Sequence, residues 1–407
     1  MNTPEQPIRV LFANAWWHQD IVNGTVRHAA ERGWHVDLQV CMSGRLPERW
    51  QGDGIITMLG GDRVELGRLI DDAKCPAVSL NDNFADFNIP RISQDDAIAG
   101  NMAAEHFLER GFNSFAFYSH GLSPDTAERR YSAFAARLRQ EGYETNPILW
   151  ADARGKRADT WLNRQEWLRE TLSTLPKPLA VFALNDEAAT EVIEACLAES
   201  ITVPESVAVL GMLDMAIFRN STTIPLSSIQ VDFDTITRVA CDVLARMMDG
   251  EPPPAHPILF PPTGIASRRS TDTIAAHLPE VARAVRFMLG NYARQFGTDD
   301  IAHAAGVCKT LLYDAFASDM GQTPYAVLNR IRVDNAKRLL VDTSKKIETV
   351  AEECGFGNRI NLHRHFKRSL GTSPAAFRKQ EREKTRDTPT GPVPVERSLP
   401  TPRGRAD

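Results

Sequence analysis

The stretch VAEECGFGNRINLHRHFKRSLGTSP, residues 350–374, repeats the pattern of IAHAAGVCKTLLYDAFASDMGQTP, residues 301–324. The two copies align at an offset of 49 residues, which becomes 50 after one extra residue in the second copy. The aligned pairs are Ala302 with Ala351, Gly306 with Gly355, Leu312 with Leu362, Phe316 with Phe366, Gly321 with Gly371, and Pro324 with Pro374. A repeat of this period indicates a duplicated supersecondary unit.

Each copy has the features of a helix-turn-helix. A small alanine lets two helices approach closely, and Gly306 or Gly355 supplies the tight turn between them. The leucine and phenylalanine four residues apart lie on one face of the second helix, where they anchor it in a core. Asn358 is a suitable N-cap for the second helix of copy two. Cys308 occupies the same position in copy one and is a poor cap.

The opposite face of each second helix is predicted to contact DNA. It carries Arg359, Ile360, His363 and Arg364 in copy two, and Lys309, Thr310, Tyr313 and Asp314 in copy one. A DNA major groove accommodates one such helix, and arginine can bind guanine with two hydrogen bonds. The helical stretch 324–343 between the copies would place the two helices roughly 34 Å apart, about one DNA turn.

The charge distribution supports this interpretation over a merely solvated charged face. Residues 280–384 contain 18 Lys and Arg against 12 Asp and Glu, a net charge of +6, whereas the remaining residues contain 29 against 40, a net charge of −11. A basic module attached to an acidic body indicates a polyanionic partner for one end of the chain only.

The first two-thirds of the chain alternates short apolar runs with amphipathic helical stretches, which is typical of parallel sheets with helices on both faces. The predicted strands lie within residues 8–14, 34–41, 52–59, 75–80, 114–120, 179–185 and 207–213. Ligands of such folds bind at the carboxyl ends of the strands. We therefore predict an effector domain over 1–271, a linker over 272–279, a DNA-binding domain over 280–384 and a disordered tail over 385–407.

Other features argue for a cytoplasmic protein that is not an enzyme. The six cysteines are far apart and form no C-x-x-C pair, which favours reduced thiols over a disulfide framework or a zinc site. We expect no secretion signal, no membrane-spanning segment, no metal and no cofactor. The sequence has no G-x-S-x-G or phosphate-binding-loop motif, so nothing in it predicts catalytic residues.

The basic module resembles the AraC/XylS family of transcription regulators over about 100 residues. The matching pieces are IAHAAGVCKTLLYDAF, GQTPYAVLNRIRVDNAKRLLVDTSKKIETVAEECGF and HFKRSLGTSPAAFR. The family's base-contacting positions correspond to the eight residues named above. Asp314 departs from the family pattern, in which a basic or neutral residue is commoner, and Ile360 could only contact a thymine methyl group.

The body resembles the sugar-sensing domain of LacI/GalR-type regulators, which have a two-lobed α/β fold like that of type I periplasmic binding proteins. The matching pieces are FALNDEAA, VPESVAVLGMLD, PLSSI and PPTGIASRRSTD. The order of the two parts is similar to that in regulators of xylose operons. The resemblance therefore implies a monosaccharide effector, with D-xylose the first candidate.

The residues expected to bind the sugar lie at strand ends or match family segments. They are Trp16, Trp17, Gln19, Asp20, Asp95, Arg129, Arg130, Asn185, Asp186 and Asp214. Aromatic rings can cover a sugar face, and carboxylate, amide and guanidinium groups can bind its hydroxyls. Alternatives remain: the tryptophans could close the interface between the lobes, Asp186 could cap a helix that begins at Glu187, and Asp95 one that begins at Ala97. Leu213 stands where the family often has an acidic residue, so the sugar recognised could differ from xylose.

These features together predict a DNA-binding transcription regulator, an activator of sugar catabolism genes. The predicted partners are a double-stranded DNA operator, the sugar, a second copy in a homodimer and, for an activator, RNA polymerase, with no membrane. Three alternatives stay open: another sugar, repression, or a solute-binding receptor. The missing signal peptide and the basic module argue against the receptor.

Overall fold

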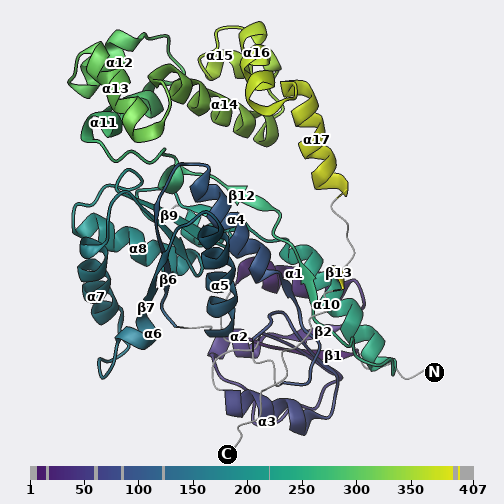
Figure 1. Ribbon diagram of the computed structural model, residues 1–407. Coiled ribbons are helices and arrows are strands. Elements are labelled where there is room, and N and C mark those ends of the chain that lie inside the picture. Colours follow the sequence, from purple (N-terminus) through teal and green to yellow (C-terminus); the bar gives the residue numbers. More distant parts are fainter. Residues whose placement is uncertain are drawn as a thin grey trace, which may run out of the picture.

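The computed structural model describes residues 7–14, 18–58, 63–83, 87–121, 124–219, 221–387 and 393–394. Figure 1 shows two α/β lobes and a separate group of helices that covers the far side of the second lobe. None of the described helices is long and apolar enough to cross a bilayer.

The first lobe is built on a four-stranded parallel sheet in the order β2-β1-β3-β4. Its strands are short, and the residues of β3 and β4 are all buried because helices cover both faces of the sheet. The bounds are β1 Arg9–Ala13, α1 Gln19–Ala30, β2 His35–Asp37, α2 Gln39–Ser43, β3 Gly54–Thr57, α3 Arg63–Ala73 and β4 Ala77–Ser79.

The second lobe contains a six-stranded sheet in the order β12-β10-β9-β8-β6-β7, parallel except for the edge strand β12. Every residue of β8 and β9 is buried. The bounds are α4 Asp96–Leu108, β6 Ser114–Ser119, α5 Pro124–Gln140, β7 Thr145–Leu149, α6 Trp150–Ala153, α7 Trp161–Thr174, β8 Leu179–Ala183, α8 Asp186–Ala198, β9 Val207–Met212, α9 Ala216–Arg219, β10 Ser227–Gln230 and β12 Gly264–Ala266.

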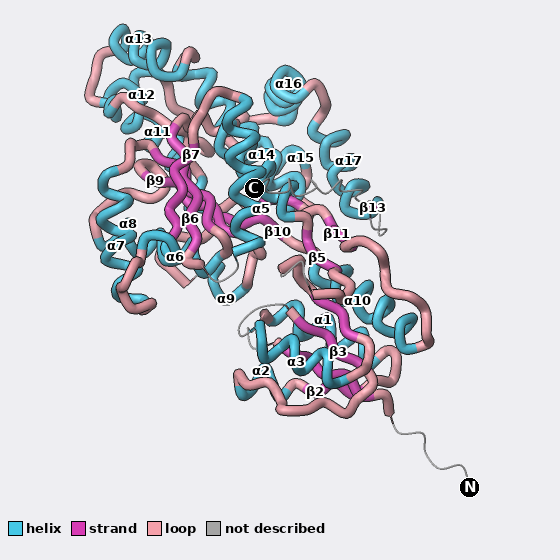
Figure 2. The backbone as a smooth tube through the Cα atoms, turned by 60° about the horizontal axis from the view of Figure 1, so that its bottom comes forward, coloured by secondary structure: helices cyan, strands magenta, loops and turns pink. Residues whose placement is uncertain are grey.

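Three crossings of the chain join the lobes. The chain leaves the first lobe after β5 (Ile92–Gln94), returns after β10 to form α10 (Phe233–Met248), and leaves again after β11 (Ile258–Phe260). Helix α10 packs against α1, and β5 pairs in parallel with β11. Figure 2 shows the two sheets in separate lobes with these crossings between them. The two-lobed α/β fold predicted from the sequence is confirmed.

Residues 279–387 form helices joined by short connections, as predicted. After a 3-10 turn at Arg269–Thr271, the first helix-turn-helix lies between α11 and α14, and the second lies between α14 and α17. The bounds are α11 Pro279–Asn291, α12 Thr298–Ala305, α13 Lys309–Met320, α14 Pro324–Asp342, α15 Ile347–Glu353, α16 Arg359–Leu370 and α17 Pro374–Asp387.

The two helix-turn-helix units have the same local construction. Gly306 and Gly355 have φ angles of 71° and 75°, the left-handed conformation that glycine adopts without strain. The leucine and phenylalanine of each second helix are fully buried. Helix α14 contributes to both cores: Val327, Leu328 and Ile331 pack with the first unit, and Val333, Ala336 and Leu340 pack with the second.

The predicted linker is ordered and hydrogen-bonded at both ends. Ala275 packs in the core of the α/β lobes, whereas its neighbour Ile274 packs in the core of the first helical unit. The carboxylate of Asp319 accepts hydrogen bonds from the backbone N–H groups of His277 and Leu278, which caps the start of α11.

Two expectations differ from the structure or fall partly outside it. The strand predicted over 34–41 ends at Asp37, whose side chain accepts a hydrogen bond from Gln39 N at 2.9 Å and turns the chain into α2. The tail predicted over 385–407 lies outside the described residues except for the end of α17 and the strand β13, Val393–Pro394, which pairs with β11.

The packing of α16 predicts a strong contrast between its two faces. Phe366→Ala should destabilise the second helical unit by about 3–5 kcal/mol, because the ring is fully buried beside Phe377. Ile360→Ala, on the same helix but 79% exposed, should change stability by less than about 0.5 kcal/mol. Hydrogen exchange of α16 peptides in urea measures both, and equal effects would contradict this packing.

Candidate DNA-binding face and effector site

The structure places all eight predicted DNA-binding residues on exposed surfaces of the two second helices. Four lie on the first turns of α13 and four on the first turns of α16. Tyr313 is 41% exposed and Ile360 is 79% exposed although both are apolar. Exposed apolar side chains beside basic ones suit contact with base edges and thymine methyl groups in a major groove.

The starts of α13 and α16 differ, as predicted. The side chain of Asn358 accepts a hydrogen bond from Asn361 N at 2.9 Å and caps α16, whereas Cys308 makes no side-chain cap bond at α13. Lys309 pairs with Asp299 at 2.8 Å, and Arg364 donates to the side chain of Asn361 at 3.2 Å. These two contacts hold basic groups near the surface that would face DNA.

A buried ionic cluster lies where the two lobes meet. The carboxylate of Asp96, at the start of α4, is paired with Arg130 Nε at 2.9 Å and with Arg129 Nη2 at 3.1 Å. Asp96 and Arg130 are each 3% exposed. Arg130 also donates to the carbonyl oxygen of Leu184, after β8. Burial of this kind is tolerated only because every charge has a partner.

Residues after β4 extend the cluster into the first lobe. Asp82 is paired with Arg91 Nε at 3.2 Å and lies 3.8 Å from Arg129 Nε. The side chain of Asn83 accepts a hydrogen bond from Thr126 Oγ1, in the first turn of α5, at 2.8 Å. Because α5 follows β6, the carboxyl edges of the two sheets face each other here, which is where ligands of such folds bind.

Some polar atoms near this edge are buried without a hydrogen-bond partner among the described residues. They are Arg91 Nη1 and both ring nitrogens of His120, which follows β6 and is 4% exposed. Glu187 lies near His120, with its Oε2 4.0 Å from Nε2 of the ring. Burial lowers the pKa of His120, so the ring is neutral and offers one donor and one acceptor. Buried polar groups of this kind are available for hydrogen bonds to a polar ligand.

Asp186 has a structural role in the second lobe. It is 1% exposed, and its carboxylate accepts hydrogen bonds from Ser228 Oγ and Met215 N, both at 2.6 Å. Burial raises its pKa to about 7. Ser228 Oγ in turn accepts a hydrogen bond from Asp214 N at 2.9 Å. Asp186 therefore anchors the loop after β9, in which Leu213 and Asp214 have positive φ angles.

Asp214 lies on that loop and is tied to the end of the effector domain. Its carboxylate is paired with Arg268 Nη1 at 2.7 Å and with Arg219 Nε at 3.3 Å. Gln230 Nε2 adds a hydrogen bond at 3.0 Å. With Asp214 7% exposed and bonded to three side chains, its position is set by the residues that precede the linker.

The other predicted sugar-binding residues do not join the cluster. Asp95 caps α4 by accepting from Ala97 N and Ile98 N, and Asn185 caps α8 by accepting from Ala188 N. The interpretation of Asp186 as a helix cap is wrong, because α8 begins at Asp186 itself. Gln19 and Asp20 are exposed on the first turn of α1. Trp16 and Trp17 lie outside the described residues.

Sequence reasoning missed Asp82, Arg91, Asp96 and His120. The signals were present in SLNDN after the fourth predicted strand and in the second aspartate of SQDD. The residue at which a helix begins can be predicted from sequence only to within one or two residues. The sequence therefore does not show which of two adjacent aspartates caps the helix and which is buried.

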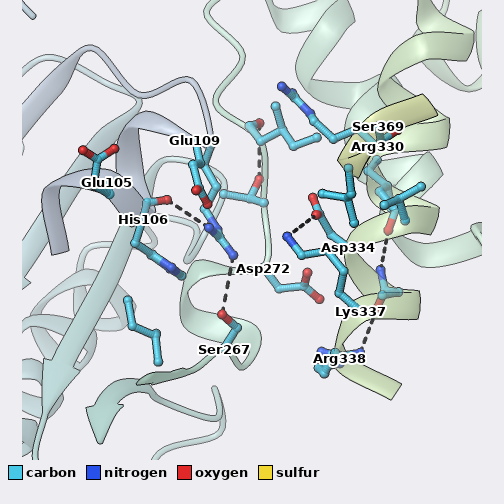
Figure 3. Close-up of a pocket in the computed structure, with 18 of the residues that line it drawn as sticks. Glu105, His106, Glu109, Ser267, Asp272, Arg330, Asp334, Lys337, Arg338 and Ser369 are labelled. Carbon is cyan, nitrogen blue, oxygen red and sulfur yellow. Dashed lines mark hydrogen bonds and ion pairs between the residues drawn. The ribbon is translucent and has the colours of Figure 1, made fainter. Parts of the chain in front are cut away.

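A groove of about 1670 Å³ separates the α/β lobes from the helical part. Figure 3 shows its two walls: Glu105, His106 and Glu109 from α4 and its end on one side, and Arg330, Asp334 and Lys337 from α14 on the other. Asp272 of the linker lies between them in this view. The groove is distinct from the buried cluster, because neither Asp96 nor its arginine partners line it.

The far end of α4 holds the start of the linker through a chain of hydrogen bonds. Ser227 Oγ donates to the carbonyl of Arg268, so it accepts the bond from Thr271 Oγ1 at 2.8 Å. Thr271 Oγ1 must then accept from His106 Nε2, 3.0 Å away. Burial lowers the pKa of His106 well below its usual value, so this ring is neutral with the proton on Nε2.

Arg110 adds a second connection at this end. Its Nε donates to the carbonyl of Thr271 at 3.0 Å, and its own carbonyl accepts from Ala275 N at 2.9 Å. Helix α4, about 20 Å long, therefore runs from the ionic cluster to the linker.

Comparison with known proteins identifies both parts of the chain. A family described as periplasmic binding protein-like domain matches residues 104–271, and a helix-turn-helix domain family matches residues 301–380. The chain is 26% identical to the xylose operon regulatory protein of Escherichia coli K12 over 400 residues, which covers 93% of this chain and 98% of the relative. It is 27% identical to the protein of the same name from Haemophilus influenzae, over 80% of this chain and 84% of the relative.

Solved structures show the same fold. A structure described as the xylose-binding transcription activator XylR has a TM-score of 0.62 and 24% identity, and the match covers 93% of this chain and 99% of that one. A LacI transcriptional regulator from a Rhodococcus species matches 66% of this chain and all of that one, with a TM-score of 0.53 and 21% identity. The chain therefore combines a periplasmic-binding-protein-like domain with an AraC-type helix-turn-helix domain, as predicted.

The raised pKa of Asp186 predicts a pH-dependent stability. Because the folded-state pKa of about 7 lies above the unfolded value of 3.8, Asp186 favours the folded state most below pH 4, and this contribution is lost as pH rises to about 7. As pH rises from 4 to 7, the free energy of unfolding of Asp186→Asn should therefore increase relative to that of the wild type, by up to about 4 kcal/mol.

Urea unfolding of both proteins at pH 4 and pH 7 measures this difference. Asp20→Asn, a substitution at an exposed aspartate, serves as the control and should show little change. If the difference in free energy of unfolding between wild type and Asp186→Asn is the same at both pH values, the raised pKa of Asp186 is contradicted.

Proposed function

We propose that this transcription regulator, an AraC-type helix-turn-helix domain joined to a periplasmic-binding-protein-like domain, binds D-xylose where its two lobes meet. The observation that carries the proposal is the buried ionic cluster between the lobes, beside which Arg91 Nη1 and the ring of His120 have no hydrogen-bond partner among the described residues. Two relatives, which match 93% and 80% of this chain, are named for the xylose operon.

The chemistry of the cluster suits a small polyhydroxylated ligand. Carboxylates such as Asp82 and Asp96 accept hydrogen bonds from sugar hydroxyls, and Arg91 and Arg129 donate to them. The neutral ring of His120 can do either. Because Asp82 and Arg91 come from the first lobe and Asp96, Arg129 and His120 from the second, a ligand bound to both sets would stabilise one arrangement of the lobes.

The DNA-binding role is assigned to residues 280–384, and the effector role to residues 1–271. The recognition helices are α13 and α16, with Lys309, Thr310, Tyr313 and Asp314 on the first and Arg359, Ile360, His363 and Arg364 on the second. We place two copies of the protein on a repeated operator, where the sugar-bound form activates transcription by RNA polymerase.

Helix α4 supplies a physical route from the sugar to the DNA-binding domain. Asp96 lies at its first residue, and His106 and Arg110 hold Thr271 at its other end. Arg268 forms a second route, because it pairs with Asp214 and lies three residues before Thr271. A change in lobe arrangement would therefore move the linker, and the groove in Figure 3 leaves space for the helical domain to follow.

Sugar binding can be tested by thermal melting of the purified protein against a panel of pentoses and hexoses. A ligand at about 100 times its dissociation constant adds about 2.7 kcal/mol to the folded state, so D-xylose should raise the melting temperature clearly. Asp96→Asn should abolish the shift, whereas Asp20→Asn, at an exposed site, should keep it. A shift with a different pentose would move the assignment to that sugar, and no shift with any sugar would overturn it.

DNA binding can be tested on the duplex that the wild-type protein selects from a random-sequence pool. Replacing Arg359 and Arg364 with alanine should weaken binding at least about tenfold, since each base contact contributes about 1–3 kcal/mol. Replacing the exposed effector-domain residues Arg139 and Arg246 with alanine removes the same charge and should leave affinity nearly unchanged. Equal affinities for the two double variants would contradict the assignment of α16 as a recognition helix.

A further inference from the structure

The two helix-turn-helix units meet at the middle of α14, where a polar patch separates their cores. Apolar residues of α14 up to Ile331 belong to the first core, and those from Val333 onward belong to the second. Between them lies Arg332, which is only 5% exposed, followed by Asn335, also 5% exposed. A buried arginine at this point requires partners, and those partners come from the first unit.

The guanidinium of Arg332 binds the loop between α11 and α12. Its Nε donates to the carbonyl of Tyr292 at 2.9 Å, and its Nη2 donates to the carbonyl of Arg294 at 2.8 Å. The guanidinium carbon also lies 5.7 Å from the centre of the Phe296 ring. One side chain thus fixes both the position and the direction of this loop along α14.

The same loop contacts the turn of the second unit directly. Gln295 Nε2 donates to the carbonyl of Gly355 at 2.9 Å. Gly355 has a positive φ angle, and a Cβ atom at this position would lie 2.0 Å from the carbonyl oxygen of Tyr292 and 2.8 Å from Arg332 Nε. A larger residue would force the two units apart.

We propose that Arg332, Gln295 and Gly355 form a clasp that fixes the spacing and orientation of α13 relative to α16, and thereby sets the spacing of DNA subsites that one protomer accepts. Helix α14 alone joins the units through one rod, which can bend and twist. The clasp adds a second connection beside the rod, so that the two recognition helices move as one body. Arg332 is a positioning residue here: it acts through α13 and α16 and contacts no base.

The clasp matters because two linked binding modules gain from each other only when geometry allows both to engage. A rigid pair binds correctly spaced subsites strongly and misplaced ones weakly. A flexible pair binds both with similar, intermediate affinity. The role in DNA-subsite spacing rests on the proposed DNA-binding function. The rigid connection between the two helix-turn-helix units can be measured without DNA.

The first test measures the distance between the recognition helices in the full-length protein. Spin labels are attached at Ser318→Cys on α13 and Ser369→Cys on α16, both exposed positions, in a background where Cys41, Cys75 and Cys308 are replaced by serine. The wild-type distance distribution should be narrow, and Arg332→Met should broaden it clearly. Gln295→Ala removes one exposed side chain and should broaden the distribution less. This variant replaces Arg332→Met in the test if Arg332→Met does not fold.

Arg283→Met is the matched control. Arg283 Nε also donates to a backbone carbonyl, that of Ala305 at 2.8 Å, but both residues belong to the first unit. This variant loses the same kind of bond without touching the junction, so its distribution should stay narrow. A distribution for Arg332→Met or Gln295→Ala as narrow as that of the wild type would overturn the clasp.

The second test uses the duplex selected by the wild-type protein and a derivative with two base pairs inserted between the segments that α13 and α16 protect. The insertion should weaken wild-type binding on the order of 100-fold, and should weaken binding of Arg332→Met at least about tenfold less. The same loss in both proteins would overturn the role in spacing. If the wild type selects no duplex at all, the DNA-binding function fails, while the spin-label measurement still decides whether the clasp exists.

Discussion

An arginine wholly or partly removed from water must find acceptors for its N–H groups, and this chain places such an arginine at each junction between its parts. Arg130 pairs with Asp96 and the carbonyl of Leu184 where the two lobes meet. Arg110 donates to Thr271 where the effector domain meets the linker. Arg332 binds the carbonyls of Tyr292 and Arg294 where the two helix-turn-helix units meet. The apolar cores stabilise each part separately, and these polar contacts fix how the parts are arranged.

This division of roles gives the protein a way to respond to a ligand. Apolar packing is non-directional and tolerates small rotations, whereas a guanidinium bonded to two acceptors has one geometry. The junction between the lobes is where a sugar would compete for or complete the hydrogen bonds of Asp82, Arg91 and His120. A change in the lobe arrangement would then move the linker and the helical domain attached to it. The clasp on α14 would keep the two recognition helices in a fixed arrangement during this movement.

The sequence predicted the helical domain well because its determinants are local. A leucine and a phenylalanine one helical turn apart, with a glycine and a proline at fixed offsets, define each unit, and Asn358 lies where its cap was expected. It predicted the two-lobed fold from alternating strands and helices, but it did not predict β5, β7, β10 or β12. Their sequences, ISQ, TNPIL, SSIQ and GIA, are short and rich in polar or small residues, so they do not form the apolar runs that indicate buried strands.

The candidate site was predicted less well, for reasons of helix phase and long-range contact. A shift of one residue at the start of a helix exchanges the cap with its neighbour. The prediction therefore names Asp95 where Asp96 is the buried group of α4, and it considers Asp186 as the cap of α8 where Asn185 is the cap. Arg332 has no local signal, because an arginine between apolar residues of a helix usually faces solvent. Its partners lie about 40 residues earlier in the chain, and only the tertiary structure brings them together.

The most direct test of the account is the coupling between the two proposed ligands in the full-length protein. The affinity for the selected duplex should be measured with and without saturating D-xylose, and the affinity for D-xylose with and without saturating duplex. Linkage requires the two ratios to be equal, and the account predicts a common factor of about 5–150, the usual range for coupled sites. A ratio of one in both directions would show that the sugar and DNA sites act independently and would contradict the account.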